Sequence, residues 1–304
     1  MKKVKIVSFL ITFIQCTAVL IIPVAISFTV PIAKRGFFCN DPALSLPRLS
    51  DTIPNAILVF WGFSPIFVLL LCEIVFNRKT CDSNLSCLNV SWRNTSYLYH
   101  RYVINLVLMH VFLFTVKYCT RSHRYVKLPS GSDENYFYLL VFAYFCRPHF
   151  FETCKPDALL TCKDGTFVQN YTCTNKQASF DIIDSSQSFF SGHAAVCFYS
   201  CTFIAWYLQK RIKSRNVLLL PLVQTLLISL AYFGAISRVF DHRHHVIDVT
   251  VGSIVGILTC MHAWLYQCRT FANDFQSLPS TCLRKIAPMP SHNGDSNTNA
   301  TNEG

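Results

Sequence analysis

Charged residues are scarce in this chain of 304 residues, since they make up only 14% of the sequence, and just 16 residues are acidic. Hydrophobic residues account for 52%, and the mean hydropathy is +0.34. The apolar residues gather in runs long enough to cross a bilayer, which takes roughly 20 residues per helix. Because a bilayer offers the backbone no hydrogen-bond partners, such runs form helices. The composition therefore predicts a multi-pass helical membrane protein rather than a soluble one.

Six apolar runs define the predicted spans. They cover about residues 6–31, 53–76, 102–118, 193–209, 217–236 and 246–267. The first run is well beyond the roughly 7–15 residues of a signal-peptide core, so we interpret it as a span. We predict an all-α fold, a six-transmembrane-helix bundle over residues 1–269 with a long outer loop between spans 3 and 4. Residues 270–304, rich in Ser, Asn, Pro and Gly, are predicted to be a disordered cytosolic tail.

The basic residues indicate the orientation of the spans. The connection QKRIKSRN (209–216) contains no acid and a dense basic group: Lys210, Arg211, Lys213 and Arg215. Short basic loops stay in the cytosol, so this connection and both chain ends are predicted to be cytosolic. The net charge of +11 is on this interpretation a topology signal, and we expect no nucleic-acid partner.

The same topology sorts the glycosylation sequons and the cysteines. Asn170 lies in the long outer loop and is the predicted glycosylation site. The other sequons fall on the cytosolic side and should be silent: Asn84, Asn89, Asn94 and Asn299. Four cysteines lie on the oxidising side and are candidates for disulfides, in a pairing that their spacing leaves open: Cys39, Cys154, Cys162 and Cys173.

Three polar segments meet on the outer side in this topology. They are RPH (147–149), SGH (191–193) and SRVFDHRHHVID (237–248). Ionisable residues at a membrane boundary are costly, which makes them candidates for function. His244 and Asp248 are four residues apart and share a helix face, so the carboxylate can fix the imidazole tautomer and leave one nitrogen as a nucleophile.

The remaining residues of these segments suit a phosphate group. Arg147 and Arg238 carry planar guanidinium groups that match phosphate oxygens. Ser191 and Gly192 open a predicted helix, whose free amides favour an anion. His193 is a second histidine that can act as a general acid. Together the set indicates phosphoryl transfer through a phosphohistidine without a metal.

Two other interpretations of HRHH (242–245) compete with catalysis. Such a cluster is often a basic juxtamembrane group with no catalytic function. A zinc site would need three or four ligands with suitable neighbours, but Arg243 stands among the histidines and no Cys-x-x-Cys accompanies them. Catalysis is favoured because all three polar segments occur together on one predicted face.

These residues carry a resemblance to a known family. The sequence resembles the lipid phosphate phosphatases, the integral-membrane branch of the type-2 phosphatidate phosphatase superfamily, whose motifs are K-x6-R-P, (P)-S-G-H and S-R-x5-H-x3-D. SFFSGH (188–193) resembles the second motif in its lipid-phosphatase form, and residues 237–248 match the third at the required spacing. KRGFFCND (34–41) resembles a stretch of the first outer loop of this branch. The resemblance covers about residues 1–270.

The resemblance implies roles for the site residues. His244 would be the nucleophile, Asp248 its orienting partner and His193 the acid that protonates the leaving alcohol, with His242 and His245 as bystanders. The phosphate would be held by Lys117, Arg147, Ser191, Gly192 and Arg238. The resemblance also implies a membrane lipid substrate (phosphatidate, lysophosphatidate, sphingosine 1-phosphate or ceramide 1-phosphate) and no metal or other cofactor. We expect the enzyme in the plasma membrane, with endomembranes as the open alternative, an extracellular or lumenal site, and a homo-oligomer compatible with this class.

The first motif is interrupted. Leu140 stands seven residues before Arg147, where the family has lysine. Lys117 is instead followed by six residues and Arg124, and removal of residues 124–146 gives KYCTRSHRPHFFETC, which restores K-x6-R-P. We interpret these 23 residues, or 69 nucleotides, as a translated intron that keeps the reading frame. The alternative is a genuine insertion, such as a re-entrant hairpin, with Lys117 still reaching the site from the end of span 3.

A non-enzymatic function is the second hypothesis. Some relatives of this family keep the six-helix fold but have lost catalytic residues, and they act as membrane proteins that bind lipids or partners. The presence of His193, His244 and Asp248 favours the enzyme. The displaced lysine favours a catalytically impaired member.

Overall fold

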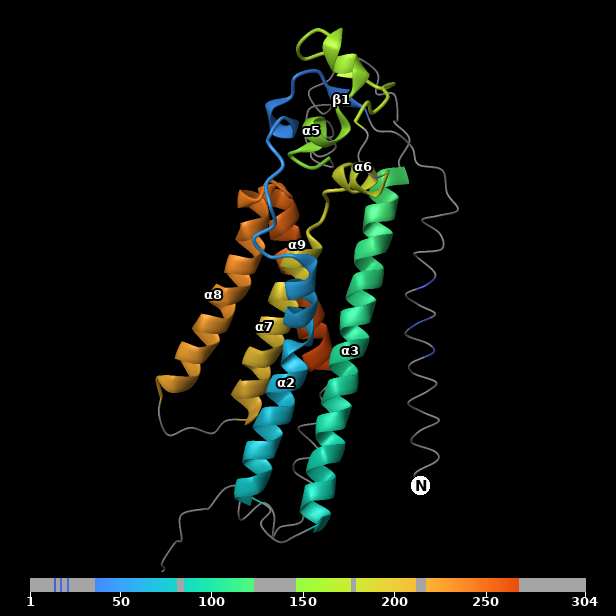
Figure 1. The fold of residues 1–304 in the computed structure, drawn as a ribbon. Helices are drawn as coiled ribbons and strands as arrows, with labels where there is room; N and C mark the ends of the chain where they lie inside the picture. Colours follow the sequence, from blue (N-terminus) through green and yellow to red (C-terminus); the bar gives the residue numbers. More distant parts are fainter. Residues whose placement is uncertain are drawn as a thin grey trace, which may run out of the picture.

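The computed structural model describes residues 36–80, 85–122, 146–175, 179–211 and 217–267, together with the single residues Ile14, Thr17 and Ile21. Most of the described chain is helical, as the sequence predicts (Figure 1). The predicted tail, nearly all of the predicted first span and most of the segment 124–146 lie outside the described residues.

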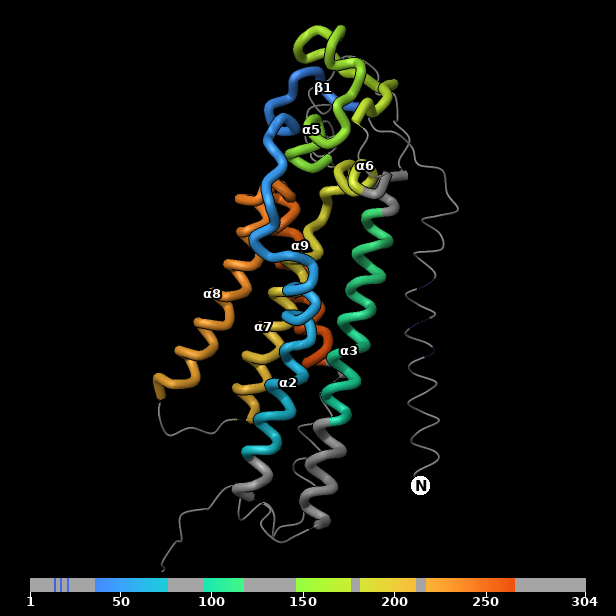
Figure 2. The backbone as a smooth tube through the Cα atoms, in the orientation of Figure 1, coloured from blue at the N-terminus to red at the C-terminus, as the bar shows by residue number. Residues whose placement is uncertain are grey.

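Five long helices run side by side (Figure 2). They are α2 (Asn55–Thr80), α3 (Leu85–Ser122), α7 (Gly192–Arg211), α8 (Leu219–Phe240) and α9 (Val246–His262), with a π-helical turn, η3 (Ala263–Gln267), after α9. Among the described residues, four stretches are long and apolar enough to cross a membrane: Asn55–Val75, Ser96–Lys117, Leu219–Phe240 and Val246–Leu265. These four correspond to predicted spans 2, 3, 5 and 6, so the prediction of a multi-pass membrane protein is confirmed.

Helix α7 forms where span 4 is predicted but is less apolar than those four stretches. It packs against α2, α8 and α9, and most of its residues are buried (Figure 1). The buried set includes polar side chains, such as Ser200, whose hydroxyl lies 3.1 Å from that of Tyr102 on α3. A helix that is surrounded by protein can carry such residues, because neighbouring helices satisfy their hydrogen bonds.

Two glycines of α9 allow it to lie very close to α7. A Cβ atom added at Gly252 would lie 2.4 Å from the carbonyl oxygen of Ser191, and one added at Gly256 would lie 2.4 Å from that of Ala195. Small residues four apart let two helix backbones approach each other in membranes. The Gly252 contact matters for the site, because it sets the distance between the start of α9 and the SGH segment.

A small folded cap lies at one end of the bundle, at the top of Figure 1. We define the cap as residues 36–53, 146–175 and 179–190. Its elements are β1 (Phe37–Phe38), η1 (Pro42–Leu44), α5 (Phe150–Cys154), η2 (Asp157–Leu160), β2 (Phe167–Val168) and α6 (Ser179–Ser185). The two-residue strands β1 and β2 pair antiparallel, which is the exception to the predicted all-α fold.

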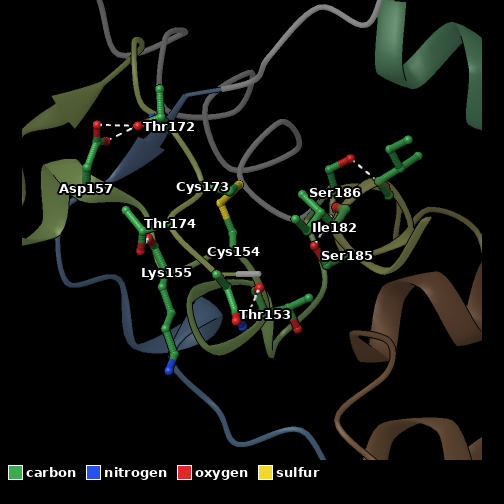
Figure 3. Close-up of a disulfide and its surroundings, with 12 residues drawn as sticks. Thr153, Cys154, Lys155, Asp157, Thr172, Cys173, Thr174, Ile182, Ser185 and Ser186 are labelled. Carbon is green, nitrogen blue, oxygen red and sulfur yellow. Dashed lines mark hydrogen bonds between the residues drawn. A yellow bond between two sulfur atoms is a disulfide. The ribbon is translucent and has the colours of Figure 1, made fainter. Parts of the chain in front are cut away.

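Aromatic rings and disulfides hold the cap together. The ring of Phe37 packs edge-on against those of Phe151 and Tyr171, with centroids 5.0 and 5.1 Å apart. Disulfides join Cys39 to Cys162 and Cys154 to Cys173, which are the four predicted cysteines in one of the pairings left open (Figure 3 draws the second bond). The Cys39–Cys162 disulfide anchors the segment before α2 to the segment before α7, and Cys154–Cys173 closes a short loop within the latter segment.

Candidate active site

The predicted site residues gather at the cap end of the bundle. Ser191 and Gly192 lie at the start of α7, Arg238 lies near the end of α8, and Asp248 lies in the first turn of α9. Arg147 comes from the cap, just before α5. The expected convergence on one face therefore follows from helices that all begin or end at the same level.

The turn between α8 and α9 explains the spacing of the third motif. The backbone amides of Arg243 and His244 both donate to the carbonyl oxygen of Arg238, at 2.9 and 3.1 Å. The five residues between Arg238 and His244 thus close one compact turn. Asp248 then accepts the amide of His245 at 3.0 Å and caps α9. This hydrogen bond holds the carboxylate of Asp248 beside the turn that carries His244.

His244 and Asp248 meet through a third residue. Nδ1 of His244 lies 3.6 Å from Oδ2 of Asp248, which is too long for a hydrogen bond. The hydroxyl of Ser188 lies 3.2 Å from the same Nδ1 and donates to the same Oδ2. The amide of Ser191 donates to the backbone carbonyl of Asp248 at 3.0 Å. All of these residues are buried, so no bulk water screens the contacts.

The environment keeps the imidazole of His244 neutral. Burial lowers the pKa of His244 well below its usual value, and the nearby positive charges of Arg147, Lys117 and Arg238 lower it further. The neutral ring carries one proton. Nδ1 faces the Ser188 hydroxyl, which itself donates to the carboxylate of Asp248. Nδ1 therefore keeps the proton, and Nε2 keeps its lone pair. An imidazole in this state is a nucleophile.

The two predicted phosphate-binding arginines are each held by an acidic residue. Arg147 donates to the side chain of Asp184 at 2.7 Å and to the carbonyl oxygen of Arg243 at 3.1 Å. Arg238 donates to Asp51 at 2.9 Å and also to Asp241 at 3.4 Å. Nε of Arg238 is buried and has no hydrogen-bond partner among the described residues. An unpartnered buried donor favours a bound anion, because leaving it unpaired is costly.

Lys117 and His193 complete the set of predicted residues. Lys117, near the end of α3, donates from Nζ to the carbonyl oxygen of Gln187 at 3.5 Å. It therefore lies close to His244 although its motif is interrupted. Nε2 of His193 lies 3.2 Å from the carbonyl oxygen of Ile53, an atom that can only accept, so Nε2 bears the proton.

Three acidic residues (Asp51, Asp184 and Asp241) and Ser188 belong to this network but were not predicted from the sequence. Asp51 pairs with both Arg238 and Arg243. Burial acts to raise the pKa of Asp51, but the two guanidinium groups outweigh it and hold the pKa below its usual value. An acid directly before an apolar run was a signal for Asp51, whereas Asp184 and Ser188 carried none beyond the proximity of Ser188 to SGH.

The other histidines near the site have different partners. Nδ1 of His242 lies 2.9 Å from the carbonyl oxygen of Pro47, and Nε2 of His245 lies 3.0 Å from that of Cys146. His149 lies 2.8 Å from the hydroxyl of Thr153, and burial, with Arg147 nearby, lowers the pKa of His149 to about 4. Within the described ranges, no three His, Cys, Asp or Glu side chains converge as metal ligands.

Known proteins resemble this chain over most of its length. Residues 135–272 match the PAP2 superfamily. The chain is 32% identical over 236 residues to phospholipid phosphatase 1 of Mus musculus, an alignment that covers 77% of this chain and 75% of that protein. It is 28% identical over 261 residues to phospholipid phosphatase 2 of Bos taurus, covering 82% of this chain and 79% of that protein.

A third relative is a putative phosphatidate phosphatase of Drosophila melanogaster. It is 28% identical over 243 residues, which cover 75% of this chain and 60% of that protein. No solved structure matches the chain. The chain belongs to the PAP2 superfamily. It is a lipid phosphate phosphatase of that superfamily, and so a phosphatase hydrolase, as its motifs predict.

Proposed function

We propose that this phosphatase hydrolyses the phosphate monoester of a membrane lipid, such as phosphatidate, lysophosphatidate, sphingosine 1-phosphate or ceramide 1-phosphate. The observation that carries the proposal is a neutral buried imidazole, His244, with its Nδ1 tied to Ser188 and Asp248 and three basic side chains around it. The site lies where apolar helices end, which is the level of lipid headgroups. The names of the relatives support phospholipid substrates.

The first half of the reaction transfers the phosphoryl group to the enzyme. Nε2 of His244 attacks phosphorus, the phosphorus–oxygen bond to the lipid breaks, and a phosphohistidine forms. His193, which enters this step as the imidazolium, gives its Nδ1 proton to the departing alkoxide and keeps its Nε2 proton on the carbonyl oxygen of Ile53. The lipid leaves as the alcohol. Asp248 stabilises the positive charge that develops on the ring of His244.

The second half returns the enzyme to its starting state. A water molecule attacks the phosphorus, the phosphorus–nitrogen bond breaks and inorganic phosphate is released. His193, now a neutral imidazole, takes the proton of that water at Nδ1. The residues that hold the phosphate oxygens through both steps are Lys117, Arg147, Arg238, Ser191 and Gly192. Their positive charges and amide dipoles stabilise the transition state, so this mechanism requires no metal.

We place the site on the extracellular or lumenal face of a six-span protein, in the plasma membrane. Helix α7 ends, with Lys210 and Arg211 in its last turn, at the end of the bundle opposite the site, which supports this orientation. The two disulfides of the cap support it too, because disulfides persist in oxidising compartments. Asn170 is exposed on the cap and accessible for glycosylation.

Residues 124–146 remain, in our proposal, a translated intron, with a genuine insertion as the alternative. The position of Lys117 beside the site means that the printed chain has a lysine available in either case. Sequencing the transcript across codons 117–150 decides between the two, because transcripts that uniformly retain these codons would exclude an intron.

The activity test is phosphate release from phosphatidate in detergent micelles that contain EDTA. The printed chain is compared with a version that lacks residues 124–146, each beside its His244→Ala variant. Activity that requires His244 in either chain supports the proposal. Absence of release from both folded chains would instead favour the second candidate function, a catalytically impaired member that binds lipids or partners.

A further inference from the structure

We propose that Ser188 is a positioning residue of this phosphatase, which carries the interaction between Asp248 and His244 and sets the nitrogen that attacks the substrate. The inference rests on the proposed nucleophilic role of His244. It assigns a function to a side chain that lies outside the three polar segments (147–149, 191–193 and 237–248), three residues before Ser191.

Ser188 links His244 to Asp248 by hydrogen bonds. Because Nδ1 of His244 is 3.6 Å from Oδ2 of Asp248, the two groups share no direct hydrogen bond. The Ser188 hydroxyl has one hydrogen, which it donates to Oδ2. Its oxygen lone pairs are then available to Nδ1 at 3.2 Å, so the imidazole must donate from Nδ1. One hydroxyl thereby fixes the tautomer of the ring.

Burial makes this link hard to replace. Ser188 and Asp248 are fully buried, and the side chain of His244 is 3% exposed. Oδ1 of Asp248 already lacks a hydrogen-bond partner among the described residues. If the Ser188 hydroxyl is removed, the Nδ1 proton of His244 faces a gap, and the other tautomer, with its proton on Nε2, becomes accessible. That tautomer cannot attack phosphorus through Nε2.

The backbone around Ser188 is held by other contacts, so the hydroxyl can be removed without releasing the segment. Phe190 is buried and packs against Phe112 of α3, with centroids 5.9 Å apart. The amide of Ser191 is bonded to the carbonyl of Asp248, and Gly252 lies against the carbonyl of Ser191. A loss of function in Ser188→Ala should therefore reflect the missing hydroxyl.

The first measurement is steady-state hydrolysis of phosphatidate by the full chain and its variants. We expect Ser188→Ala to lower kcat roughly 10- to 100-fold, the range for losing an outer partner that orients a reactive group, with little change in KM. Ser188→Cys has a side chain of similar shape that is a weaker donor, so its kcat should lie between those of the parent chain and Ser188→Ala. Ser185→Ala is the matched control, because Ser185 is equally buried and its hydroxyl donates only to the carbonyl of Ile182.

A double-mutant cycle with Asp248→Asn tests whether Ser188 acts through the carboxylate. We expect Ser188→Ala to cost almost nothing further in the Asp248→Asn background. Full kcat in Ser188→Ala would mean that His244 and Asp248 pair directly, and equal losses in both backgrounds would mean that Ser188 acts independently. Either result overturns the inference while leaving the nucleophile intact.

A measurement that needs no turnover separates this inference from the proposed function. In protein labelled with nitrogen-15 at histidine, the His244 signals, assigned by their loss in His244→Ala, report which ring nitrogen carries the proton. We expect a proton on Nδ1 in the parent chain and a shift toward Nε2 in Ser188→Ala. An unchanged tautomer would reject the role of Ser188. Catalysis that survives His244→Ala would instead reject the proposed function.

Discussion

The two parts of the phosphate site are built in different ways. Arg238, His244 and Asp248 lie within one helix end, one turn and one helix start, and hydrogen bonds within residues 238–248 shape that turn. Lys117 and Arg147 come from α3 and from the cap, and each is positioned by contacts distant in sequence, with Gln187 and Asp184 respectively. The first part is a local structure, and the second is an assembly of separate elements.

This difference determines which spacing matters. In the local part, an added residue would break the turn that returns the amide of His244 to Arg238. In the assembled part, the position of Lys117 depends on how α3 packs along the bundle, and that packing does not depend on the number of residues before Arg147. An interrupted motif is therefore compatible with a lysine at the site.

Breaking the local part at His244 should give the largest effect. We expect His244→Ala to lower kcat on the order of 10⁴-fold or more, as the loss of a nucleophile does in other covalent mechanisms. The measurement is phosphate release from phosphatidate in micelles. His242→Ala is the control and should remain active, since the ring of His242 is directed at the carbonyl oxygen of Pro47, 2.9 Å from its Nδ1. Substantial release by His244→Ala would contradict the assignment.

Lys117 tests the assembled part. We expect Lys117→Met, which keeps the apolar stem and removes the charge, to lower kcat/KM roughly 10- to 100-fold, the cost of one charged hydrogen bond. The loss should be similar with and without residues 124–146. Thr115→Ala is the control, because its hydroxyl bonds only within α3. A loss confined to the shortened chain would mean that Lys117 does not serve the site in the printed chain.

A substitution at Gly252 tests the close contact between α9 and Ser191 at the start of α7. We expect Gly252→Ala to destabilise the protein by about 1–3 kcal/mol, because the added methyl would meet a backbone carbonyl that cannot rotate away. Activity should fall with stability, since the contact positions Ser191. The control is the neighbouring Ser253→Ala, whose hydroxyl bonds within its own helix. The measurement is thermal unfolding in detergent, and equal melting temperatures for both variants would contradict the close approach.

The sequence predicts the two parts of the site unequally, and the reason is physical. The nearness of His244 and Asp248 could be predicted from their spacing of four residues, but His244 lies in the turn before α9 and not on a shared helix face. The apolar runs predicted α2, α3, α8 and α9 because lipid selects them by composition. By contrast, Asp51 and Arg238 are 187 residues apart, and only the packing of the cap on the bundle brings them together. Ser188 was missed for the same reason.

His149 makes the cap beside Arg147 sensitive to acid. The pKa of His149 is about 4 in the folded protein, because burial and Arg147 disfavour the charged form. The unfolded chain takes up this proton near pH 6.5, so stability should be independent of His149 above that pH and should fall between about pH 6.5 and about pH 4. His149→Asn, which does not titrate, should lose less melting temperature than the parent when the pH falls from about 7.5 to about 5. Equal losses would contradict the lowered pKa.

Asn170 should have the smallest effect on activity and the clearest bearing on topology. It lies on the cap, between β2 and Cys173, and the same cap contributes Arg147 to the site. A glycan on Asn170 therefore places both parts of the site in the extracellular or lumenal space. We expect Asn170→Gln to remove the glycosidase-sensitive mobility shift and to leave activity unchanged. A shift that persists in Asn170→Gln would mean that a sequon assigned to the cytosol faces the opposite side, and the proposed topology would be wrong.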